Sequence, residues 1–101
     1  HSPIMDSAKK ALQEVINKTN FKTPICPIYQ NVCSTAISDK KILKINLIEQ
    51  LTNPVRWYQT IEKMIYDGAS QFYEVGPGNV LIGLNRRINR EIPSSKATIE
   101  N

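Results

Sequence analysis

Apolar side chains recur at the spacing of an α-helix in four stretches of this chain. The stretches cover about residues 6–18, 40–51, 54–67 and 79–90, and their apolar positions fall at intervals of three and four residues. Four amphipathic helices are therefore predicted. Their inward-facing positions are expected to be Ala8, Ala11, Leu12, Val15, Ile16, Leu43, Leu47, Ile48, Leu51, Trp57, Ile61, Met64, Ile65, Leu81, Leu84 and Ile88.

Capping residues mark where the predicted helices begin and end. Ser38 or Asp39 can cap the second helix, since both side chains accept a hydrogen bond from the first turn. Asn53 followed by Pro54 is a start signal for the third helix, because proline is favoured at the first helical position. Gly68 is expected to end that helix.

Two short stretches have the composition of β-strands. "ICPIYQNV" at 25–32 and "QFYEV" at 71–75 are rich in β-branched and aromatic residues. Pro27 favours an edge position or a strand start. The order α-β-α-α-β-α predicts an α/β fold with parallel strands, because helices separate the strands. Residues 1–92 are expected to form one structured part and residues 93–101 a flexible tail.

A sheet of two short strands is too small to cover four amphipathic helices, and both of its edges would lie open. We therefore expect the chain to be a fragment that forms one side of a larger doubly wound sheet.

The composition is that of a globular protein and excludes several classes of partner. Apolar residues make up 41% and charged residues 22%, and no apolar run approaches the ~20 residues of a membrane span. Thirteen basic and nine acidic residues give a net charge of +4, which favours acidic partners. The densest basic cluster is Arg86, Arg87 and Arg90 near the end of the last helix. No aromatic residues interleave it, so nucleic-acid binding is not expected.

The glycines of "EVGPGNVLIGL" invite comparison with phosphate-binding loops. The third glycine of a G-x-G-x-x-G motif would fall at Leu81, and no Lys-Ser/Thr pair follows. Pro77 also removes a backbone N–H that could have held an anion. A structural turn is favoured, and a small anion-binding protein that uses the Gly76–Gly78 turn is kept as an alternative.

No residue stands out by itself as a catalytic group. Ser70 follows Gly68 at the spacing of a nucleophile elbow, but Phe72 stands where the second glycine of the elbow is required. Cys26 and Cys33 are expected to be reduced thiols, and two cysteines with one histidine fall short of a four-ligand zinc site, so no metal is expected. His1 alone is a terminal histidine, usually solvent-exposed.

Four segments in order change this picture. "HSPIM", "QNV", "EQLTNPVRW" and "FYEVGPGNVLIGLNRRI" resemble, at this spacing, the C-terminal part of malonyl-CoA:acyl carrier protein transacylases, over about Ser2 to Ile88. The "EQL" before "NPVRW" is more similar to the free-standing enzymes of type II fatty acid synthesis than to polyketide synthase domains. The resemblance implies the C-terminal half of an α/β-hydrolase-like acyltransferase domain.

The resemblance also implies a mechanism. His1 matches the general base that takes the proton of an upstream serine, and Gln50 matches the position whose backbone carbonyl orients the imidazole. The serine attacks malonyl-CoA and passes the malonyl group to the phosphopantetheine thiol of acyl carrier protein. The family uses no acidic triad member, no bound cofactor and no metal in this chemistry.

Three functional residues of the family have no counterpart in this sequence: the elbow serine, the arginine that pairs with the malonyl carboxylate, and a glutamine of the oxyanion hole. None of Arg56, Arg86, Arg87 and Arg90 matches the motif of that arginine. The isolated chain is therefore expected to be inactive, with the N-terminal part of the same enzyme and acyl carrier protein as partners. The Arg86–Arg90 cluster is a candidate contact for the carrier protein. A cytoplasmic location is expected, with an organellar one left open. A catalytically inactive interaction module is a further alternative.

Overall fold

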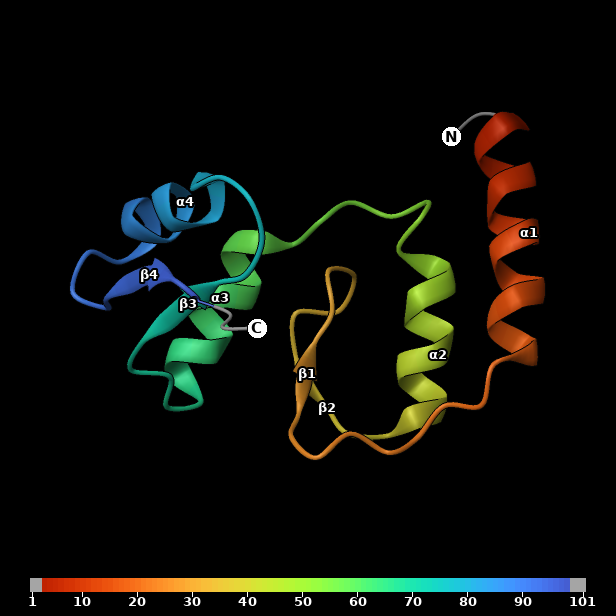
Figure 1. Ribbon diagram of the computed structural model, residues 1–101, viewed down its shortest axis with the longest axis horizontal. Coiled ribbons are helices and arrows are strands. Elements are labelled where there is room, and N and C mark those ends of the chain that lie inside the picture. The colour runs from red at the N-terminus through yellow and green to blue at the C-terminus, as the bar shows by residue number, and fades with distance from the viewer. Residues whose placement is uncertain (1–2, 99–101) are drawn as a thin grey trace. The chain divides into compact units, whose positions relative to one another are not determined.

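The structure is a computed structural model, and it describes residues 3–98 (Figure 1). It divides into two compact units, one up to Thr60 and one from Ile61 onward, and each is described by itself. The elements in chain order are α1 (Pro3–Lys18), β1 (Ile28–Tyr29), β2 (Ala36–Ile37), α2 (Lys40–Glu49), α3 (Trp57–Tyr66), β3 (Phe72–Glu74), α4 (Val80–Ile88) and β4 (Ser94–Lys96). The boundary between the units falls within α3.

In the first unit, α1 and α2 lie side by side and run in opposite directions (Figure 1). The β1–β2 pair is an antiparallel hairpin with Ile28 opposite Ile37 and Tyr29 opposite Ala36. The buried apolar side chains of this unit are Ile16 from α1 and Leu43 and Ile48 from α2. The helical spacing predicted the inward side of α2, but on α1 only Ile16 is buried, and the predicted inward positions Ala8, Ala11 and Val15 are exposed.

A buried glutamine joins the loop after β1 to α2. Gln30 is 8% exposed, and its Nε2 donates to the carbonyl of Leu43 at 2.8 Å. Its Oε1 accepts from Nδ2 of Asn46 at 3.0 Å. Both ends of the buried amide are therefore satisfied, as a buried polar group requires.

The two helix starts in this region have different outcomes. Asp39, one of the two predicted caps, begins α2, and its side chain accepts from the N–H of Lys41 at 2.8 Å. The start predicted at Asn53 and Pro54 was wrong, because α3 begins only at Trp57. Asn53 instead donates from its Nδ2 to the carbonyl of Glu49 at 2.7 Å, so it belongs to the end of α2.

The second unit is built on β3 and β4, which pair in parallel with Phe72 opposite Ser94 and Glu74 opposite Lys96. The connecting helix is α4, so the parallel arrangement follows the rule on which the sequence prediction depended. The most buried side chains of this unit are Ile61, Ile82 and Asn85. The positions predicted for the inward face of α4, which were Leu81, Leu84 and Ile88, are only half-buried.

Gly68 ends α3, as predicted. Its φ of 112° lies in the left-handed region, which favours glycine. The N–H of Gly68 donates to Ile65 at 3.0 Å and that of Ala69 to Met64 at 2.9 Å, which is the Schellman pattern of bonds.

The strand predictions need correction. The two predicted strands do not pair with each other, and β1 is antiparallel to β2, not parallel to another strand. Their partners β2 and β4 were missed, because β2 has two residues and β4 reads Ser-Ser-Lys, with no β-branched or aromatic side chain. β4 also lies within the segment 93–101, which was expected to be a flexible tail.

Within residues 3–98, none of the helices has the length and apolar composition that crossing a bilayer demands.

Several large apolar side chains are exposed in this chain, among them Val15, Ile25, Ile42, Ile45 and Tyr66.

We predict that Gln30→Ala destabilises the chain. The substitution removes two hydrogen bonds, from Gln30 to the buried Leu43 carbonyl and from the part-buried Asn46 amide to Gln30, and the expected loss is about 1–3 kcal/mol of unfolding free energy. Urea denaturation followed by circular dichroism measures it. Gln59→Ala, at an exposed position of α3, is the matched control and is expected to change stability by less than about 0.5 kcal/mol. Equal effects of the two changes would contradict a structural role for Gln30.

Candidate functional site

The C-terminal end of α2 holds Gln50, one of the two predicted site residues. Gln50 is the C-cap of the helix, with φ of −65° and ψ of −18°, and its N–H donates to the carbonyl of Asn46 at 2.9 Å. It is half-buried. Among residues 3–98, no group donates a hydrogen bond to its carbonyl. The structure therefore presents a main-chain acceptor at the end of this helix.

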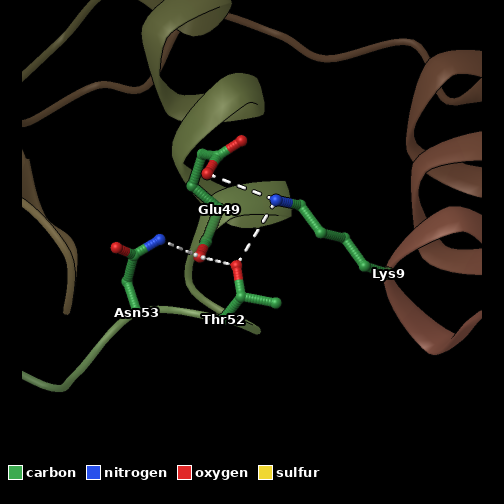
Figure 2. A network of polar contacts seen from close by, with 4 residues as sticks. All are labelled: Lys9, Glu49, Thr52 and Asn53. Carbon is green, nitrogen blue, oxygen red and sulfur yellow. Dashed lines mark hydrogen bonds and ion pairs between the residues drawn. The ribbon is translucent and has the colours of Figure 1, made fainter. Parts of the chain in front are cut away.

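A network of polar contacts ties this helix end to α1 (Figure 2). Nζ of Lys9 lies 3.3 Å from Oε2 of Glu49 and donates to Oγ1 of Thr52 at 3.3 Å. The carbonyl of Glu49 accepts from Asn53 and from the N–H of Thr52 at 3.2 Å. The side chains of Lys9 and Glu49 are 27% and 47% exposed, so the ion pair contributes little stability and acts mainly on geometry.

The opposite directions of α1 and α2 put the start of α1 at the same end of the pair as the end of α2 (Figure 1). Lys9, which contacts the last turn of α2, lies six residues after Pro3, or about 9 Å of helix rise. His1, the predicted general base, lies outside the described residues, so its distance from Gln50 is not part of the structure. The pairing of His1 with Gln50 stays a prediction.

The glycine turn of the second unit is filled by groups of the chain itself. Gly76 and Gly78 have φ of 117° and 80°, and Nζ of Lys96 donates to both of their carbonyls, at 2.6 Å in the case of Gly78. Oε1 of Glu74 accepts from the N–H of Ile82 at 3.0 Å in the first turn of α4. A carboxylate thus occupies the helix N-terminus where an anion would bind. This arrangement favours the structural turn over the anion-binding alternative.

The basic cluster lies where the sequence predicted, with Arg86 and Arg87 in the last turn of α4 and Arg90 just beyond it. All three are exposed, and they border a cavity of about 480 Å³. Its remaining lining residues are Ile92, Pro93 and Ser94. The hydroxyl of Ser94 is buried and has no hydrogen-bond partner among the described residues. The place of Ser94 beside the arginines could not be predicted, because its segment has no pattern typical of a strand or a helix.

The other residues considered from the sequence belong to different units, with Ser70 in the second and Cys26, Cys33 and Arg56 in the first. Arg56 and Ser70 are exposed, and the N–H of Arg56 donates to the carbonyl of Asn31 at 2.9 Å. Cys26 and Cys33 are free thiols. Within the described part of the chain, no three acidic, cysteine or histidine side chains come together as ligands of a metal.

Comparisons with known proteins identify relatives along nearly the whole chain. A malonyl CoA-acyl carrier protein transacylase of Bacillus subtilis (strain 168) is 39% identical over 92 residues, which are 91% of this chain and 29% of the relative. An acyl-carrier-protein-S-malonyltransferase from Bartonella henselae, solved by crystallography, matches 95% of this chain and 31% of its own, with a TM-score of 0.88 and 36% identity.

A malonyl-transacylase solved in complex with a type II PKS acyl-carrier protein matches with a TM-score of 0.84 and 34% identity. The match covers 100% of this chain and 32% of that one. No protein-family model matches the sequence. The resemblance to the C-terminal part of malonyl transacylases is thereby confirmed, and the chain spans about three-tenths of the length of these relatives.

We predict that Glu74 stabilises the second unit through the N-terminus of α4. Glu74→Ala removes the acceptor of the Ile82 N–H and is expected to lower the unfolding free energy by about 1 kcal/mol. Glu74→Gln keeps an acceptor oxygen and should lose less. Thermal denaturation of the chain measures both, and Glu62→Ala, at an exposed position of α3, is the control. Inorganic phosphate should not change the Tm of the chain without substitutions. A rise in Tm would contradict the view that the Glu74 carboxylate occupies the N-terminus of α4.

Proposed function

We propose that this chain, which is similar over 91% of its length to a malonyl CoA-acyl carrier protein transacylase, carries the general base of such an enzyme. The reaction is transfer of a malonyl group from coenzyme A to the phosphopantetheine thiol of acyl carrier protein in type II fatty acid synthesis. The observation that carries the proposal is the 39% identity over 92 residues, and the resemblance of the motif that begins at His1 supports it.

In the proposed chemistry, His1 serves a serine that another part of the enzyme contributes. The imidazole takes the proton of the serine hydroxyl while the oxygen attacks the malonyl thioester carbon. The C–S bond then breaks, and the imidazolium returns the proton to the departing thiolate of coenzyme A. The second half of the reaction is the reverse, with the carrier protein thiol as nucleophile. No metal and no bound cofactor enters these steps.

Gln50 would act through its main chain. An acceptor at one ring nitrogen of His1 fixes the tautomer and leaves the other nitrogen free to take the serine proton. The carbonyl of Gln50 has no donor among residues 3–98, and carbonyls at a helix end point outward along the axis. The negative end of the α2 dipole would also stabilise the imidazolium. The start of α1 at the same end of the helix pair supports this assignment (Figure 1).

The proposed partner of this chain is acyl carrier protein, which is in general acidic and would bind a basic surface of the chain. Arg86, Arg87 and Arg90 are exposed around one cavity, which suits a surface that receives carboxylates or phosphate. A structural relative is a malonyl-transacylase in complex with an acyl-carrier protein, which supports this class of partner. A cytoplasmic location follows from the proposed pathway.

We predict that His1→Ala abolishes transfer in a complete enzyme. A suitable enzyme is a hybrid in which this chain replaces the matching 92 residues of the Bacillus subtilis relative. Loss of the general base should lower kcat/KM for malonyl-CoA by about 10²–10⁴-fold. Gln50→Ala should change it only a few-fold, because alanine keeps the carbonyl. Release of coenzyme A measures the rate. An active hybrid that is insensitive to His1→Ala would refute the proposed role and favour an interaction module.

We predict that reversing the charge of the Arg86–Arg90 cluster weakens the binding of acyl carrier protein but not that of malonyl-CoA. Arg86→Glu, Arg87→Glu and Arg90→Glu together should raise the KM for acyl carrier protein about tenfold or more at low salt, with the KM for malonyl-CoA unchanged. The matched control reverses three exposed lysines, Lys10, Lys18 and Lys22, and so makes the same change in net charge. Equal effects of the two triple variants would show that overall charge, and not this surface, attracts the carrier protein.

A further inference from the structure

The way α2 ends leaves the Gln50 carbonyl without a donor among residues 3–98, because the nearby donors bind the carbonyl of Glu49. The carbonyl before it, that of Glu49, accepts from Nδ2 of Asn53 at 2.7 Å, from the N–H of Thr52 at 3.2 Å and from Oγ1 of Thr52 at 3.5 Å (Figure 2). The donors that follow the helix are therefore directed to Glu49 and not to Gln50.

The residue that would continue the helix has no donor. In an α-helix the carbonyl of residue 50 would accept from the N–H of residue 54, and residue 54 is proline, which has none. A proline also disfavours helical backbone at the residue before it, which is Asn53. The chain then runs away from α2, because the N–H of Arg56 donates to the carbonyl of Asn31 at 2.9 Å.

Gln50 is half-buried as a residue, and its main-chain carbonyl is open to a hydrogen bond from any group that supplies a donor. An imidazole N–H is such a donor. We propose that Asn53 and Pro54 are positioning residues that keep the Gln50 carbonyl free for the catalytic histidine, Asn53 by engaging Glu49 and Pro54 by withholding an N–H. This inference rests on the proposed function and adds to it the residues that shape the acceptor.

The test is Pro54→Ala, which supplies the missing N–H. In the 101-residue chain labelled with ¹³C and ¹⁵N, the expected result is a scalar coupling across a new hydrogen bond from the amide nitrogen of residue 54 to the carbonyl carbon of Gln50. In the hybrid enzyme, kcat and kcat/KM for malonyl-CoA should fall together by about tenfold to a hundredfold, with KM unchanged. A coupling without a fall in kcat would overturn the proposal, and so would a fall in kcat without a coupling.

Pro27→Ala is the matched control, since Pro27 is exposed and precedes β1, and it should change neither the coupling nor kcat. If Pro54→Ala does not fold, Asn53→Asp replaces it. This variant keeps the shape of the side chain but cannot donate to the Glu49 carbonyl, and a fall in kcat of about fivefold at constant KM is expected. An unchanged kcat would overturn the proposal.

These outcomes are distinct from failure of the proposed function. If His1→Ala leaves the active hybrid unchanged, the function is wrong whatever happens at residue 54. If His1→Ala abolishes activity and Pro54→Ala and its replacement do not affect it, the function stands and the positioning role is wrong.

Discussion

The hydrogen bond from the side chain of Asn53 to the carbonyl of Glu49, 2.7 Å long, ends α2 and sets the path by which the chain leaves it. Lys9 reaches the same turn from α1, so the helix end and the neighbouring helix are fixed by one set of polar groups (Figure 2). At the other end of α2, Asp39 caps the first turn and the buried Gln30 holds the carbonyl of Leu43. The helix is thus anchored at its start, middle and end by groups from outside it.

In the second unit, polar groups close the turn between β3 and α4. In the first unit, by contrast, the polar groups at the end of α2 leave the Gln50 carbonyl without a donor among residues 3–98. Glu74 occupies the N-terminus of α4, and Lys96 engages the carbonyls of Gly76 and Gly78. The glycines have positive φ because the turn must reverse direction between β3 and α4. A glycine-rich segment between a strand and a helix therefore serves here to join two elements.

Much of the fold could be predicted from the sequence wherever one residue type has one strong local preference. The apolar stripes identified four helices, Asp39 capped α2 and Gly68 ended α3. The start of α3 could not be predicted, because Asn53 and Pro54 suit both a helix start and the segment after a helix. The choice depends on whether the Asn53 side chain finds the Glu49 carbonyl, which is a contact that spacing alone does not specify.

The strands and the candidate site were harder to predict from the sequence, for a different reason. β2 and β4 are two and three residues long, and they form because a partner strand is nearby, so their own composition carries little signal. Gln50 carries no chemical signal either, since its proposed role lies in the backbone. Only the resemblance of "EQLTNPVRW" to a known motif pointed to it.

A main-chain acceptor and a carboxylate orient an imidazole by different physical means. A carboxylate brings a full charge and can be recognised by its residue type, whereas a carbonyl brings a partial charge whose direction the backbone decides. In the proposed mechanism, the information that specifies the acceptor therefore does not reside in the side chain at position 50. It is spread over the neighbours that end the helix, namely Glu49, Asn53 and Pro54. A site of this kind tolerates change at the residue that makes the contact and is sensitive to change at residues that never touch the substrate.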